Sequence, residues 1–263
     1  MVTIKTVFYI FLPIVLVLII LLKRDHFEFK SSFWINQKWQ CYDILQVVIC
    51  FSVFQIASLT MGKYELVKFY NLYIFGNIFC IVALGVILFG LIYFKYHANY
   101  SSLGLSSDRL LSNIAIGLTT FFIYTLLIIV ISFLLNREII FYNRAELFIK
   151  MKLNELPLLD SMVYVVGIIA VAPFVEECLF RGLMFSPFAR KIGELGSICL
   201  TSILWSIVHF QTKSLISLFL IGILLCYLYK RFKSLIPGIV MHSMLNLSNL
   251  IIFTFWIMNE RGM

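Results

Sequence analysis

Ionisable residues inside long apolar runs are the part of this sequence with the clearest chemical potential. Glu176 and Glu177 lie within an apolar run over 160–187, and His209 and His242 lie in two later runs. Placing a charged group at the centre of a bilayer costs at least ~2.5–3.5 kcal/mol on insertion scales. We therefore expect these groups to face one another or a hydrated cavity, as the members of a functional site.

Helical spacing gives the two adjacent acids different roles. Glu177 and Arg181 are four residues apart with the acid first, which is the favourable order for an ion pair along a helix. Glu176 points in another direction, and its own neighbour four residues on is Phe180. We expect Arg181 to neutralise Glu177, so that the Glu176 carboxylate faces the cavity and acts as a general base.

Two further pairs at helical spacing complete a hydrolytic set. Trp205 and His209 bring an indole beside an imidazole, and His242 and Asn246 place an imidazole and an amide on one helix face. Glu176 and His209 would orient and deprotonate a water molecule. His242 and Asn246 would donate hydrogen bonds to the tetrahedral oxyanion, a contribution typically worth ~10²–10³ in rate per donor. The set suits hydrolysis of a peptide bond.

The same atoms leave a metal-dependent mechanism open. Two imidazoles and one carboxylate, from His209, His242 and Glu176, could hold Zn²⁺ with one open coordination position. However, the sequence contains no H-E-x-x-H motif, and we expect no carboxylate to orient either ring. We therefore favour a site with no metal and no other cofactor, and keep zinc as the alternative.

The elements that carry these residues are predicted to be membrane-spanning helices. The 263 residues are 62% hydrophobic and 13% charged, whereas a soluble domain carries roughly 25% charged residues. This excludes a cytosolic globular enzyme, a disordered chain and a small disulfide-stapled secreted domain. A span takes about 20 apolar residues, so we predict an all-α, polytopic membrane helical bundle of about eight transmembrane helices. The runs lie at 7–22, 43–62, 69–94, 110–135, 160–187, 195–211, 214–229 and 235–257.

The connectors hold most of the charge. Lys and Arg number 21 against 13 Asp and Glu, and they cluster between the runs, where they anchor helix ends at lipid headgroups instead of binding nucleic acid. The positive-inside rule favours cytoplasmic connectors after the first, third, fifth and seventh spans, with the amino terminus outside. The amphipathic stretch around 138–152 predicts a helix lying in the membrane interface.

Three motifs resemble those of the CPBP family, which comprises the type II CAAX prenyl endopeptidases and the bacterial bacteriocin-processing and Abi proteins. The resemblance covers residues 158–255, and residues 1–157 form a separate region of transmembrane helices without motifs. Trp205 stands where the family usually has Phe. The motifs match E-E-x-x-x-R, F-x-x-x-H and H-x-x-x-N/B and read Glu176-Glu177-Cys-Leu-Phe-Arg181, Trp205-Ser-Ile-Val-His209 and His242-Ser-Met-Leu-Asn246.

The resemblance implies a CPBP/Abi-type catalytic helical core with its site sunk below the membrane surface. Its substrate would be a membrane-associated peptide or protein of the CAAX, bacteriocin or signal-peptide type, cleaved by a multi-pass integral membrane protein (of the cell membrane, if bacterial). By resemblance Glu176 is the catalytic glutamate, with Glu177, Arg181, His209, His242 and Asn246 at the other site positions. A non-catalytic immunity or regulatory partner protein remains the alternative. A proton-coupled transporter is disfavoured because the polar groups occupy one half of the chain without repeat symmetry.

Overall fold

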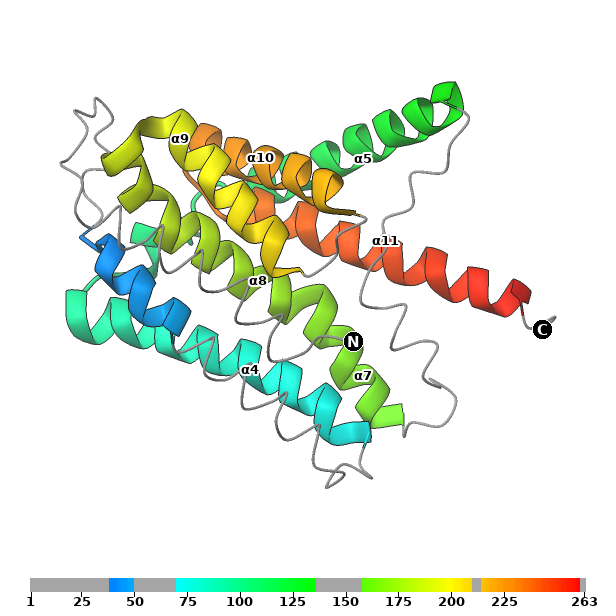
Figure 1. Cartoon of the computed structure of the whole chain (residues 1–263), viewed down its shortest axis with the longest axis horizontal. Helices are drawn as coiled ribbons and strands as arrows, with labels where there is room; N and C mark the ends of the chain where they lie inside the picture. Colours follow the sequence, from blue (N-terminus) through cyan, green and yellow to red (C-terminus); the bar gives the residue numbers. More distant parts are fainter. Residues whose placement is uncertain (1–37, 50–69, 136–157, 210–213, 261–263) are drawn as a thin grey trace.

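The computed structural model describes residues 38–49, 70–135, 158–209 and 214–260, which are almost entirely helical (Figure 1). These ranges contain no strand, so the all-α prediction is confirmed. A short helix covers 41–49. The other elements are α4 (Tyr70–Gly90), η1 (Leu91–Lys95), η2 (Tyr100–Leu103), α5 (Leu110–Leu135), α7 (Leu158–Val166), η4 (Gly167–Val171), α8 (Ala172–Glu177), η5 (Cys178–Met184), α9 (Phe185–Val208), α10 (Leu215–Phe232) and α11 (Ile236–Glu260).

Three helical stretches of the described part are long and apolar enough to cross a membrane: Leu110–Leu134, Ser161–Val208 and Leu215–Phe232. Large apolar side chains are exposed along the first of them, as expected for a helix that faces lipid. The chain is therefore an integral membrane protein. The predicted number of eight spans is not established, because the run 7–22, most of 43–62 and the predicted interfacial helix at 138–152 lie outside the described residues.

One continuous helical path runs from α7 through η4, α8 and η5 into α9, and it changes direction at Gly193. The φ angle of Gly193 is 78°, in the left-handed region that glycine adopts without a steric penalty. The chain turns there, so α9 consists of two arms joined by a kink (Figure 1). This break falls between the predicted runs 160–187 and 195–211.

Close helix contacts position the second arm of α9 and the start of α11. At Gly222 of α10, a Cβ atom would lie 2.9 Å from the Cβ of Ser202 in α9. At Gly117 of α5, it would lie 2.7 Å from the carbonyl oxygen of Pro237 in α11. Such short separations need glycine, since packed interiors leave no room for added atoms. They hold α9 against α10 and α11 against α5.

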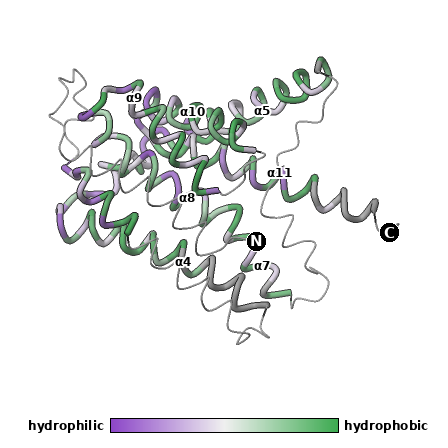
Figure 2. Tube along the Cα trace, in the orientation of Figure 1, coloured by the Kyte–Doolittle hydropathy of each residue, from purple (hydrophilic) through white to green (hydrophobic). Residues whose placement is uncertain are grey.

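The connectors described by the structure meet at one end of the bundle. The Arg190 guanidinium donates a hydrogen bond to the carbonyl of Trp39, and Leu235 N–H donates to the carbonyl of Gly104 over 3.0 Å. Lys230 and Glu194 form an ion pair of 2.5 Å. Figure 2 shows hydrophilic residues gathered at this end, which we call the connector end. The four connectors that follow the first, third, fifth and seventh predicted spans should share one side of the membrane, because successive spans alternate in direction. These contacts place the four connectors together.

Asp43 fastens the helix over 41–49 to the end of α4. Its side chain is fully buried and accepts a hydrogen bond from Gln40 N–H over 2.7 Å, as an acid in the first turn of a helix commonly does. Lys95 and Tyr96 also bond to this carboxylate. Burial and the hydrogen bond to Asp43 raise the pKa of Tyr96 above its usual value. The group is a structural anchor of the connector end.

Candidate active site

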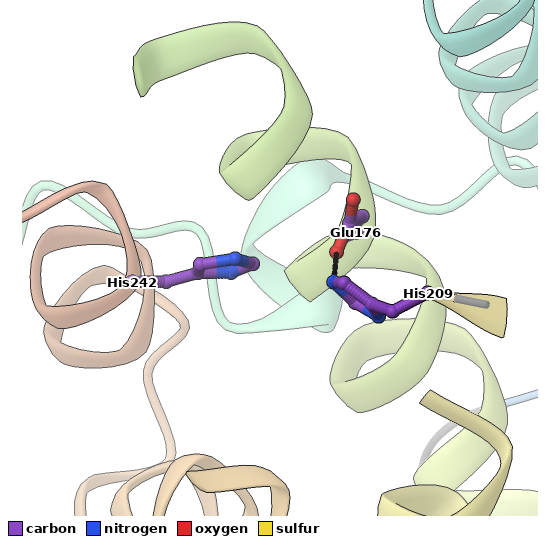
Figure 3. Close-up of side chains that lie close together, drawn as sticks. All are labelled: Glu176, His209 and His242. Carbon is purple, nitrogen blue, oxygen red and sulfur yellow. Dashed lines mark ion pairs between the residues drawn. The ribbon is translucent and has the colours of Figure 1, made fainter. Parts of the chain in front are cut away.

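Glu176 projects from α8 toward the second arm of α9. Its Oε2 atom accepts a hydrogen bond from the indole Nε1 of Trp205 over 2.9 Å. The same oxygen lies 3.7 Å from Nε2 of His209, the C-cap residue that follows α9 (Figure 3). The two rings of α9 are also in contact, with centroids 4.5 Å apart. The expected association of Glu176 with His209 is therefore present in the fold, with the Trp205 indole as an additional donor.

The hydrogen bonds of His209 determine which of its nitrogens carries a proton. Nδ1 lies 2.6 Å from the carbonyl oxygen of Trp205. Because a carbonyl oxygen can only accept, Nδ1 must be the donor. In the neutral ring Nε2 is then an acceptor, and it faces the Glu176 carboxylate, which also accepts. Two acceptors at this separation are matched by a group that donates to both, such as one water molecule.

Glu177 lies on another side of the same helix and belongs to a buried ion pair. Arg181 Nη1 donates to Glu177 Oε1 over 2.8 Å, which confirms the predicted ion pair. Arg181 Nη2 donates to the carbonyl of Gly222 over 3.2 Å, and its guanidinium carbon lies 5.0 Å from the centre of the Trp205 ring. Arg181 therefore links Glu177 to α10 and lies against the Trp205 ring.

Glu177 also holds His242, contrary to expectation. His242 Nδ1 lies 3.2 Å from Glu177 Oε1, so the prediction that no carboxylate orients either imidazole was wrong. The reason is tertiary packing: at Gly238 a Cβ atom would lie only 3.1 Å from Glu177 Oε2, so α11 passes directly over this acid. A carboxylate behind a histidine fixes the ring and its tautomer, leaving Nε2 directed elsewhere.

His242 approaches Glu176 and His209 from the opposite side (Figure 3). Donor atoms of these three residues all lie within 4.8 Å of one another. Ligands of tetrahedral zinc are about 3.4 Å apart, so the set is somewhat wider than a closed metal site. The chemical types, one carboxylate and two imidazoles with a carboxylate behind one of them, nevertheless fit zinc.

Asn246 has a structural contact in addition to its predicted place at the site. Its Nδ2 donates to the carbonyl of Ile168 over 3.0 Å. In η4 the hydrogen bonds run five residues back, as from Ala172 N–H to Gly167 O. The next donor in that register would be residue 173, but Pro173 has no N–H. Asn246 therefore satisfies a carbonyl left without its helical partner, and its second amide hydrogen remains for other acceptors.

With this geometry established, comparison with known proteins adds a family. Residues 158–248 match a family model described as type II CAAX prenyl endopeptidase Rce1-like. This part of the chain is similar to the Rce1-like family. The match confirms the resemblance to the CPBP family, and the Rce1-like segment includes Glu176, His209, His242 and Asn246. It suggests a CAAX-type intramembrane endopeptidase. No curated protein and no solved structure matches the chain.

Proposed function

We propose that this protein is an intramembrane endopeptidase that hydrolyses a peptide bond in a membrane-associated peptide or protein. The observation that carries the proposal is the convergence of Glu176, His209 and His242 from three helices, with donor atoms within 4.8 Å. Such groups are costly within a membrane unless they serve one another or a hydrated site. The Rce1-like match over residues 158–248 supports the same reaction class.

Glu176 and His209 activate the water in this proposal. A single water molecule donates one O–H to Nε2 of His209 and its second O–H to the Glu176 carboxylate. These two acceptor atoms lie 3.7 Å apart. Its lone pair then points away from both and toward the scissile carbonyl. As the water oxygen bonds to the carbonyl carbon, its proton passes to Glu176 and the carbonyl electrons move onto oxygen.

His242 and Asn246 stabilise the oxyanion that results. His242 Nδ1–H donates to Glu177, so the group that donates to the oxyanion has to be Nε2–H of the doubly protonated ring. Asn246 contributes its second amide hydrogen. When the tetrahedral intermediate collapses, the C–N bond breaks and the proton held by Glu176 passes to the leaving amine.

A glutamate-type mechanism without metal remains our preference, with zinc as the alternative. In the alternative, Glu176, His209 and His242 would hold the ion, which would polarise the carbonyl and the attacking water. Metal content distinguishes the two. Purified active protein with less than one tenth of an equivalent of divalent metal, and full activity in chelator, supports the metal-free site. Stoichiometric zinc whose removal abolishes cleavage overturns it.

Reporter cleavage in liposomes tests the proposed activity and its substrate class together. Full-length protein is given a prenylated peptide ending in a CAAX sequence and, separately, a bacteriocin-leader or signal-type peptide. We expect wild-type protein to cleave one of the two and the variants Glu176→Ala and His209→Ala to cleave neither. Unchanged cleavage in either variant would refute the assignment. Full biological activity of Glu176→Gln would instead favour the non-catalytic partner protein.

A further inference from the structure

A second candidate site lies at the connector end and shares no lining residue with the site of Glu176. It is a cavity of about 460 Å³ between the start of α5, the end of α10 and the start of α11. Three basic side chains line it, Arg109, Arg231 and Lys233, against one acidic side chain, Asp108. We propose that this cavity binds the phosphate of an anionic phospholipid headgroup.

Two of the basic residues have an unusual backbone conformation. Arg109 has a φ of 57° and Lys233 a φ of 52°, in the left-handed region that side chains other than glycine rarely adopt. Lys233 ends α10 at the position where helices prefer glycine. Among the described residues only one other non-glycine residue, His97, has a positive φ. Strained residues with functional side chains are typical of ligand sites, and here both carry a positive charge into the same cavity.

The cavity has a fixed polar wall. Asn113 is only 7% exposed, and its Nδ2 lies within hydrogen-bond distance of Ser234 Oγ (3.3 Å) and of the Asp108 carbonyl (3.4 Å). Ser234 Oγ in turn accepts a hydrogen bond from Ile236 N–H over 3.3 Å. These bonds join the start of α5 to the start of α11. The basic side chains therefore extend from a scaffold that is already organised, which lowers the cost of binding.

The position of the cavity favours a lipid over a soluble anion. It lies at the ends of α5 and α10, two helices that are long and apolar enough to span the membrane, so it is at headgroup depth. Leu110 and Leu111, at the start of α5, are exposed by 43% and 82% beside it and can contact acyl chains. Guanidinium groups match phosphate oxygens in pairs. Inorganic phosphate shares that chemistry, so the experiment must separate the two.

Lipid binding by the full-length protein tests the proposal without reference to cleavage. Native mass spectrometry in detergent measures the affinity for added phosphatidylglycerol, with phosphatidylcholine as the neutral comparison. We expect one retained phosphatidylglycerol and weak binding of phosphatidylcholine. Arg109→Gln and Arg231→Gln should each weaken phosphatidylglycerol binding about fivefold. Lys230→Gln is the matched control, because it removes the same charge from the neighbouring residue, which pairs with Glu194.

Three results would overturn the proposal. Lys230→Gln could weaken binding as much as Arg231→Gln, which would mean that only general positive charge matters. Phosphatidylcholine could bind as tightly as phosphatidylglycerol, which would remove the role of the anion. Inorganic phosphate at millimolar concentration could displace the lipid, which would make a soluble phosphate the ligand of this cavity.

Discussion

Two adjacent glutamates have different surroundings in the candidate site, and we propose different roles for them. Neighbouring residues on a helix point about 100° apart, so Glu176 faces Trp205 and His209 of α9, while Glu177 faces Arg181 and His242. The first carboxylate accepts a hydrogen bond from the Trp205 indole and lies beside Nε2 of His209. The second is held in a buried ion pair. The proposal that Glu176 is the general base and Glu177 a supporting residue rests on this difference in surroundings.

Glu177→Gln should damage stability more than a comparable change at the surface. Arg181 is fully buried, and removing one partner of a buried ion pair typically costs about 3–5 kcal/mol because the other charge is left unpaired. Thermal unfolding of the protein in detergent measures the loss. Glu194→Gln, which breaks the partly exposed pair with Lys230, is the control and should cost at most about 1 kcal/mol. Similar melting temperatures for the two variants would contradict this account of Glu177.

Trp205→Phe should slow cleavage while leaving the fold intact. The substitution keeps an aromatic ring but removes the N–H that donates to Glu176 over 2.9 Å. A hydrogen bond to a charged group contributes about 1.5 kcal/mol, which corresponds to about tenfold in turnover if the carboxylate loses its orientation. The measurement is the turnover number and KM of reporter cleavage, together with the melting temperature. An unchanged turnover number would show that the indole has only a packing role.

The local part of this arrangement could be predicted from the sequence, whereas the contacts between helices could not. The pair Glu177–Arg181 follows from four-residue spacing on one helix. The contacts of Trp205 with Glu176 and of His242 with Glu177 join residues 29 and 65 positions apart. Those depend on how α9 and α11 pack against α8. The motifs indicated that these residues belong to one site. Only the packing of the helices shows which of their atoms are in contact.

At the scale of helices, the π-helical turn η4 lies between α7 and α8, the helix that carries Glu176. It ends two residues before Pro173, and its Ile168 carbonyl accepts a hydrogen bond from Asn246 of α11. Single π turns inside α-helices are frequent at functional sites. Here the turn ties α11, which carries His242, to the helix that carries Glu176. Sequence spacing indicated a shared face for His242 and Asn246, but a change of hydrogen-bond register leaves no clear signal in composition.

Asn246→Leu should destabilise the protein in a way that depends on residue 173. The variant leaves the Ile168 carbonyl unsatisfied, at a typical cost of about 1–3 kcal/mol. Pro173→Ala restores an N–H that can donate to that carbonyl, so we expect the loss to be smaller in the Pro173→Ala background. Thermal unfolding of the two single variants and the double variant gives the coupling. Additive effects of the two substitutions would contradict the role assigned to Asn246.

At the scale of the whole molecule, charge indicates orientation. In the part of the chain that the structure describes, every Lys and Arg other than the buried Arg181 belongs to the connector end, whereas the seven Lys and Arg of the connectors predicted on the other side lie outside the described residues. The positive-inside rule predicts that this end lies in the cytoplasm. The sequence alone gave only a small excess of basic residues on this side. The contacts among connectors add that segments from 38–41 to 230–235 lie together on one side.

Cysteine labelling measures this orientation. In a background without the six native cysteines, Ser107→Cys at the connector end should react with a membrane-impermeant maleimide only after the cells are permeabilised. Leu215→Cys, at the opposite end of α10, should react in intact cells. Labelling of Ser107→Cys in intact cells would reverse the orientation, although it would leave the chemistry of the site unchanged.

The central claim is that Glu176 and His209 act together on one water molecule, and a double-mutant cycle on the cleavage rate tests it most directly. Glu176→Gln and His209→Gln should each lower the turnover number by about 10²–10⁴, the usual contribution of a general base. The double variant should be little slower than the slower single variant, because groups that act as a unit are not additive. Losses that multiply in the double variant, or a single variant with wild-type turnover, would contradict the claim.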